Sequence, residues 1–190
     1  MSWSEDIGWW IALAVALFWF VGAYNRLVRL RSAALQAYTT LDAALLRQLE
    51  YVQTRTQAEK GADAGVQAAI GQLTALLAAT RLRSMEPPAI AALATALRVV
   101  LAAWQRLHPD EVTRFDSDGV LSRPAPLEGA KPANTASASA SMAWPEPSAA
   151  AEIARGQFNL AVRQYNAAIG QFPAVLVAWI FRLRPAAPLE

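Results

Sequence analysis

An uninterrupted apolar run stands near the start of the chain. Residues 7–25 (IGWWIALAVALFWFVGAYN) carry no formal charge. As a helix rising ~1.5 Å per residue, the run is about 28 Å long, close to the roughly 30 Å of a bilayer core. We predict a transmembrane helix anchored by aromatic side chains, with Trp9, Trp10 and Tyr24 at the interfaces and Trp19 deeper against lipid. The alternative is a buried core helix, but the chain has no equally apolar partner for it.

The charges that flank this run differ in sign. Residues 1–6 contain Glu5 and Asp6 and no basic residue, whereas Arg26, Arg29 and Arg31 follow the run directly. A cleaved signal peptide needs a basic segment before its apolar core, so we predict a retained anchor. Basic residues favour the cytoplasmic side of a span. The expected topology is therefore single-pass in the cell (inner) membrane, with residues 1–6 outside and the rest cytoplasmic.

After the span, apolar residues recur every three or four positions, which is typical of amphipathic helices. The first predicted helix continues from the membrane to about residue 57, where EKGADAG breaks it. A second helix is expected to end near residue 83, and a third follows Pro87 and Pro88 and ends at residue 108. Residues 26–108 therefore hold three helices.

The pattern changes again after residue 108. Residues 109–148 are first acidic and turn-rich and then dominated by Pro, Ala and Ser, which predicts a flexible linker. Residues 149–184 carry a seam of apolar residues in alternating steps of four and three, so we expect a fourth helix, kinked or interrupted at Pro173. Residues 185–190 form a tail.

Together these elements predict an all-α fold, in which an N-terminal transmembrane helix continues into an antiparallel up-and-down four-helix bundle. Helices two and three are shorter than helices one and four, so they can cover only that part of helices one and four that lies farther from the membrane. We therefore expect an exposed apolar seam near the membrane, around residues 27–38 and 165–183.

Composition limits the chemistry. The chain has 190 residues, no cysteine and one histidine, and its 17 basic and 15 acidic residues give a net charge of +2. Disulfides and cysteine-based catalysis or zinc sites are excluded, and the charge balance does not favour nucleic acid. The sequence contains no phosphate loop, serine-nucleophile motif or zinc-protease motif. We therefore predict no catalytic residues, no metal site and no cofactor.

His108 is the one residue around which a metal or hydrolase site could be imagined, because Asp110, Glu111 and Asp116 follow it. Their spacing does not place these groups on one face, and a solvated acidic helix end explains them equally well. We treat a membrane-bound hydrolase as the weakest hypothesis.

Polar and aromatic residues on the fourth helix form a possible interaction seam. Three asparagines each follow an aromatic residue, and two of them lie seven positions apart on one helix face. They either fix helix register or contact a partner, or they are ordinary positions beside core aromatics. Two arginines after the helix either cap it or reach lipid phosphates. The seam residues are Asn25, Asn159, Tyr165, Asn166, Phe172, Trp179, Arg182 and Arg184.

Two blocks of the sequence resemble the LemA family. YNRLVRLRSAALQAYTTLD (24–42) follows the span, as the N-terminal block of that family does, and IARGQFNLAVRQYNAAIGQFPAVLVA (153–178) is similar to its C-terminal block. The proline expected after the first block is absent, since RQLEY stands at 47–51. The resemblance, to a divergent member, implies an N-terminally anchored four-helix bundle and no particular reaction.

These features favour a non-enzymatic, membrane-anchored protein with an interaction or scaffold role at the inner membrane surface. Its expected partners are the lipid bilayer and an unidentified protein or a second copy of the chain. The alternative is a membrane-tethered sensor or binding module for a small ligand or peptide.

Overall fold

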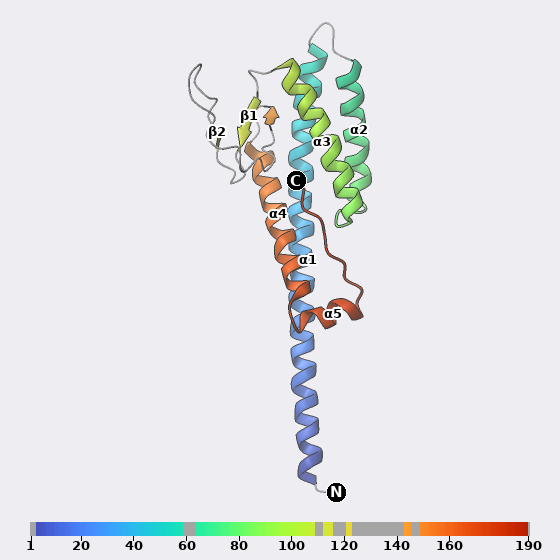
Figure 1. Cartoon of the computed structure of the whole chain (residues 1–190), viewed down its shortest axis with the longest axis vertical. Helices are drawn as coiled ribbons and strands as arrows, with labels where there is room; N and C mark the ends of the chain where they lie inside the picture. Colours follow the sequence, from blue (N-terminus) through green and yellow to red (C-terminus); the bar gives the residue numbers. More distant parts are fainter. Residues whose placement is uncertain are drawn as a thin grey trace, which may run out of the picture.

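The computed structural model describes residues 3–58, 64–108, 112–115, 121–122, 143–145 and 149–189 and is mostly helical (Figure 1). Its longest element is α1 (Trp3–Ala58), a single helix of 56 residues that contains both the apolar run and the amphipathic segment after it. A helix of this length extends about 84 Å at ~1.5 Å per residue. The predicted continuity from residue 7 to residue 57 is confirmed.

Two helices form a hairpin beside the end of α1 that lies far from the N-terminus. They are α2 (Ala64–Arg81) and α3 (Pro87–Leu107), and Pro87 occupies the first helical position, where the missing N–H costs no hydrogen bond (Figure 1). An ion pair joins this hairpin to α1, because Arg81 Nε lies 3.0 Å from Asp42 Oδ2 and 3.2 Å from Oδ1. The hairpin leaves the N-terminal half of α1 uncovered, as its length predicted.

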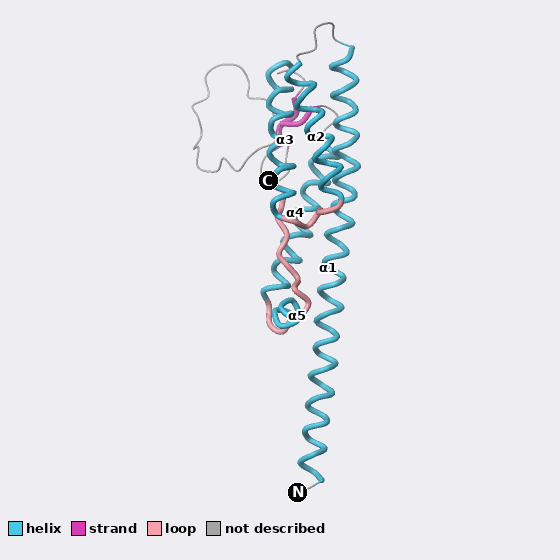
Figure 2. The backbone as a smooth tube through the Cα atoms, turned by 90° about the vertical axis from the view of Figure 1, so that its right-hand side faces the viewer, coloured by secondary structure: helices cyan, strands magenta, loops and turns pink. Residues whose placement is uncertain are grey.

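The fourth predicted helix is divided in two. α4 (Ala149–Gly170) packs along α1, and after a turn at Pro173 the short α5 (Ala174–Ile180) lies across the direction of α1 (Figures 1 and 2). The predicted interruption at Pro173 is confirmed. The prediction that this helix continues to residue 184 is wrong, because residues 181–189 are not helical and run back along α4 toward the hairpin (Figure 1).

Most of the core lies where α1, α2, α3 and α4 meet. It is built from the predicted apolar stripes, and its largest fully buried side chains include Trp104, Tyr165 and Phe158. A second, smaller cluster joins α1 to α5 through Leu27, Ala174 and Val177. The structure therefore has a main core far from the N-terminus and a minor one beside the end of the apolar run.

The structure adds three short strands within residues 109–148, where a flexible linker was expected. Three short strands, β1 (Val112–Phe115), β2 (Leu121–Ser122) and β3 (Ala143–Pro145), form an antiparallel sheet in the order β2-β1-β3. β1 pairs Arg114 with Ser122 on one side and with Ala143 on the other. Order here comes from main-chain pairing and from Trp144, which is fully buried. The rest of the expected linker lies outside the described residues.

Candidate membrane-proximal interaction site

The apolar run of α1 is exposed along its length. From Ile7 to Trp19 every side chain is exposed, including Phe18 at 83% and Trp10 at 70% of its surface. By length and composition, two described helices could cross a membrane, one within Ile7–Ala58 and one at Pro87–Leu107. The second is partly buried in the main core, as expected of a core helix, whereas the window in α1 has no buried residue.

The predicted topology residues lie directly beyond this run. Arg26, Arg29 and Arg31 are exposed on α1, so their guanidinium groups are available to solvent or to lipid phosphates. Tyr24 is partly exposed at the same level. Glu5 and Asp6 lie in α1, but their side chains are outside the described set.

Aromatic contacts bring α5 to the end of the apolar run. Trp19 and Phe172 stack edge to face with ring centroids 5.3 Å apart, and Tyr24 and Phe181 lie 4.8 Å apart. A shallow cleft between α1 and the α4–α5 turn is lined by Phe18, Gly22, Arg26 and Pro173, among others. The turn and α5 are thereby fixed beside residues 18–26 of α1.

One face of α5 is apolar and exposed. Trp179 is 80% and Phe172 68% exposed, and Val175, Leu176 and Ile180 are exposed with them, while Val177 and Ala178 are buried toward α1. Trp179 is on the surface, as we predicted. Phe172, which the sequence analysis also assigned to the possible interaction seam, is exposed at the turn before Pro173 and lies beside Trp19.

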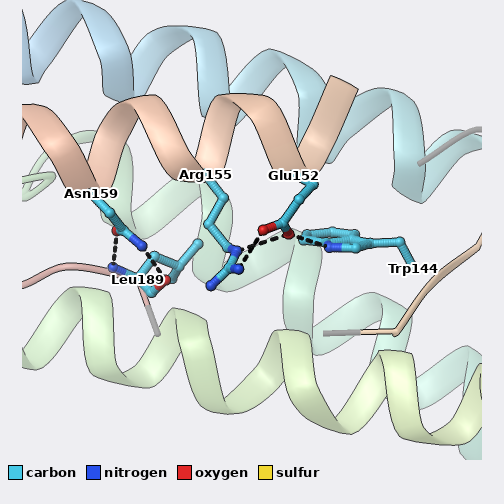
Figure 3. Close-up of polar contacts among 5 residues, drawn as sticks. All are labelled: Trp144, Glu152, Arg155, Asn159 and Leu189. Atoms are coloured by element: carbon cyan, nitrogen blue, oxygen red, sulfur yellow. Dashed lines mark hydrogen bonds and ion pairs between the residues drawn. The ribbon is translucent and has the colours of Figure 1, made fainter. Parts of the chain in front are cut away.

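Asn159 and Asn166, the predicted polar pair on α4, both hold the tail of the chain. Asn159 Nδ2 donates to the carbonyl oxygen of Leu189 at 3.0 Å, and the N–H of Leu189 donates to Asn159 Oδ1 at 2.7 Å (Figure 3). Asn166 makes the same pair of hydrogen bonds with Ala186, at 2.8 and 2.9 Å. Asn25 is not part of this arrangement and is exposed on α1.

Tyr165 belongs to the core and also touches the tail. Its side chain is buried, and its hydroxyl donates to the carbonyl oxygen of Arg184 at 3.3 Å. Burial raises the pKa of Tyr165, and the positive charge of Arg31 partly opposes this shift. Arg182 and Arg184 are exposed on the segment that leaves α5, and Arg182 adopts a left-handed φ of 51°. Except for Asn25 on α1, the seam residues therefore lie at α5 and its flanking turns or at the contacts between α4 and the tail.

The same face of α4 carries a polar cluster that the sequence reading missed. Trp144 Nε1 donates to Glu152 Oε2 at 2.8 Å, and Arg155 Nε donates to that oxygen at 3.0 Å (Figure 3). Glu152 is buried, so both donors compensate the desolvation of its charge. One sequence signal could have indicated this cluster. A lone Trp stands in a Pro/Ala/Ser-rich stretch, and an acidic and a basic residue, three positions apart, begin eight residues after it.

Within the described part of the chain, no three His, Cys, Asp or Glu side chains gather in a way that could hold a metal ion. His108 stacks on Trp104, with ring centroids 4.2 Å apart. Asp110, Glu111 and Asp116 lie outside the described residues. Comparison of the chain with protein-family models, curated proteins and solved structures finds no match.

Proposed function

We propose that this chain is a membrane-anchored, LemA-like protein with a non-enzymatic interaction or scaffold role at the inner surface of the cell membrane. The observation that carries the proposal is the exposed apolar run of α1, which continues into the exposed aromatic face of α5. An apolar surface of this extent is not stable in water without lipid or a protein partner to cover it.

The place of α5 supports a membrane-surface role. It lies across α1 beside residues 18–26, where the apolar run ends and the arginines begin (Figure 1). Tryptophan and arginine are residues that proteins place at the boundary between lipid and water, because each has an apolar part and a polar end. In the proposed arrangement, α5 rests on the cytoplasmic surface of the bilayer and Arg182 and Arg184 reach lipid phosphates.

Helix packing and sequence support the bundle. α4 pairs with α1, α2 pairs with α3, and one core joins all four helices. We propose that they form the antiparallel four-helix bundle that the resemblance to the LemA family implies. The resemblance itself rests on residues 24–42 and 153–178, and in the structure these two blocks pack against one another along α1 and α4.

A labelling experiment tests the anchor and its orientation. The chain has no cysteine, so single cysteines can replace Ser4 and Ser32, on either side of the apolar run. In intact cells, a membrane-impermeant maleimide is expected to label Ser4→Cys at once and Ser32→Cys only after permeabilisation. Labelling of Ser32→Cys from outside would reverse the topology, and recovery of the chain outside the membrane fraction would refute the anchor.

The arginines provide a matched perturbation. Changing Arg26, Arg29 and Arg31 together to Gln removes the basic flank without altering the length of the apolar run. We expect chains in both orientations, so that part of the Ser32→Cys population is labelled from outside. An unchanged labelling pattern would show that these arginines do not set the topology.

A second candidate function is a membrane-tethered binding module for a peptide. The two asparagines of α4 favour it, because they hold an extended segment by its main chain.

A further inference from the structure

The asparagine pair of α4 recognises main chain and not side chains. Each amide group donates one hydrogen bond to a carbonyl oxygen and accepts one from the N–H of the same residue, Leu189 for Asn159 and Ala186 for Asn166. The Asn159 side chain is buried, so its two bonds replace water that it cannot reach. We call Asn159 and Asn166 the asparagine clamp.

The spacing of the clamp selects a particular conformation. Seven residues of helix advance about 10.5 Å, so the two amides are about that far apart along α4. Three residues of polyproline II advance about 9.3 Å. The paired residues, Ala186 and Leu189, are three apart, and Pro185 and Pro188 precede them, which fixes φ at both prolines near the polyproline value. The clamp therefore fits an extended segment with N–H groups three residues apart.

One side chain of the tail adds a further requirement. Leu189 is fully buried and belongs to the main core, and Ala186 is 5% exposed. A small residue fits opposite Asn166 and a leucine fits opposite Asn159. The ligand class that the clamp accepts is thus an extended peptide of the pattern Pro-Ala-x-Pro-Leu.

The connection that brings the tail to its own clamp is short and exposed. Arg182 ends α5 as a left-handed cap with φ at 51°, and the N–H of Leu183 donates to the carbonyl oxygen of Ala178 at 2.8 Å, so this turn belongs to α5 and not to the tail contacts. The contacts at the clamp depend only on the segment 185–189 and are the same whichever copy supplies it. Confinement of copies in one membrane plane raises their effective concentration for such an exchange.

We propose that the asparagine clamp is a peptide-binding site and that residues 185–189 of a second copy of this chain occupy it in exchange with the resident tail. Tail exchange leaves the cap of α5 unchanged and links two copies. The inference rests on the proposed interaction role, for which it names a partner and a site. It does not depend on the orientation of the anchor.

The sequence contains a near-copy of the ligand that serves as a specificity control. Residues 123–128 read RPAPLE, against RPAAPLE at 184–190, and lack one alanine. With Leu127 in the place of Leu189, Pro124 stands opposite Asn166 and offers a carbonyl but no N–H. Such a peptide can form three of the four clamp hydrogen bonds, and we expect it to bind about two- to tenfold more weakly.

Two full-length variants test the exchange by complementation. The clamp variant carries Asn159→Leu and Asn166→Leu and keeps its tail, and the tail variant carries Ala186→Pro and Leu189→Pro, which removes both N–H donors, and keeps its clamp. Donor or acceptor dye is attached to Ser32→Cys. We expect energy transfer in lipid vesicles when the two variants are mixed, and only background transfer when either is paired with itself.

Synthetic peptides identify the site of association. The peptide RPAAPLE is expected to abolish the transfer, and RPAPLE is expected to require a higher concentration. RPAAPLE methylated on the backbone nitrogens of its first alanine and its leucine, which correspond to Ala186 and Leu189, is expected to have no effect. Inhibition by the methylated peptide would contradict main-chain recognition.

The result that would overturn the proposal is absence of transfer in the mixture while both variants retain the helical circular dichroism of the parent chain. Equal transfer in the unmixed controls would also overturn it, because association would then occur elsewhere. If a double variant loses helicity, a single variant replaces it: Asn166→Leu for the clamp variant and Ala186→Pro for the tail variant. Each single substitution alters only the contact between residues 166 and 186. Maleimide labelling of Ser4→Cys and Ser32→Cys in intact cells tests the anchor separately, so failure of one proposal is distinguishable from failure of the other.

Discussion

Side chains of one apolar seam have different roles, and burial separates them. Phe158 is fully buried against Tyr38, with ring centroids 5.8 Å apart, whereas Phe172 is largely exposed. We expect Phe158→Ala to lower the free energy of unfolding by about 3–5 kcal/mol and Phe172→Ala by about 0.5 kcal/mol or less. Denaturant titration of the full chain in detergent, followed by circular dichroism, measures both. Equal losses would contradict the assigned exposure.

Trp144 is the residue that orders the strand region. Trp144→Ala removes a fully buried ring and is expected to cost about 3–5 kcal/mol. Trp144→Phe keeps most of the ring volume but loses the hydrogen bond to Glu152 and should cost less, on the order of 1–3 kcal/mol. The same denaturant titration applies. A neutral Trp144→Ala would show that the strands do not contribute to the core.

Tyr38 is expected to make stability depend on alkaline pH. Burial, with a smaller contribution from Asp42, raises its pKa to about 12, and its buried hydroxyl has no hydrogen-bond partner among the described groups. Between about pH 10, where tyrosine ionises in the unfolded chain, and pH 12, only the unfolded state releases the proton, so stability falls as pH rises. Tyr38→Phe should reduce this fall, measured as unfolding free energy against pH, and cost little at pH 7.

At the scale of elements, the strands show what a pattern of residues cannot reveal. Helices were predictable because their apolar residues repeat every three or four positions and their ends carry Pro or Gly. The strands are two to four residues long, too short for alternation to stand out, and the pairing of β1 with β3 joins residues far apart in sequence, such as Thr113 and Trp144. The tail was missed similarly, since main-chain recognition by Asn159 and Asn166 leaves no periodicity.

The register of the sheet predicts how much of the former linker is dispensable. Ser122 and Ala143 both pair with Arg114 from opposite sides, so they lie two strand spacings apart, about 9.6 Å. Replacing residues 123–142 by about four Gly and Ser residues should therefore leave the melting temperature and helicity unchanged. Deleting residues 122–146 removes Trp144 and should lower both. Equal effects of the two deletions would contradict the order assigned to β3.

For the whole molecule, the sequence predicted the long first helix, the shorter distal hairpin and the interruption near Pro173. It did not predict that α5 turns across α1, because that orientation depends on contacts such as Tyr24 with Phe181, which no local pattern encodes. The exposed seam was expected along both membrane-proximal helices. Instead, Leu27, Tyr38 and Tyr165 are buried where α4 and α5 pack against α1, and the exposed apolar surface lies on α5 and the turn before it.

The proposed function requires that the apolar run crosses the bilayer and that α5 rests at its surface. Spin labels on Val15→Cys, Leu176→Cys and Leu82→Cys probe the run, α5 and a control. The control lies near the Arg81–Asp42 pair, about 27 Å farther along α1 than Tyr24.

Accessibility of each label to oxygen and to a water-soluble nickel chelate, measured in lipid vesicles, gives its depth. We expect the label at residue 15 near the bilayer centre, the label at residue 176 at the lipid–water interface, and the label at residue 82 in water. A label at residue 176 as accessible to nickel as that at residue 82, or a label at residue 15 in water, would contradict this expectation.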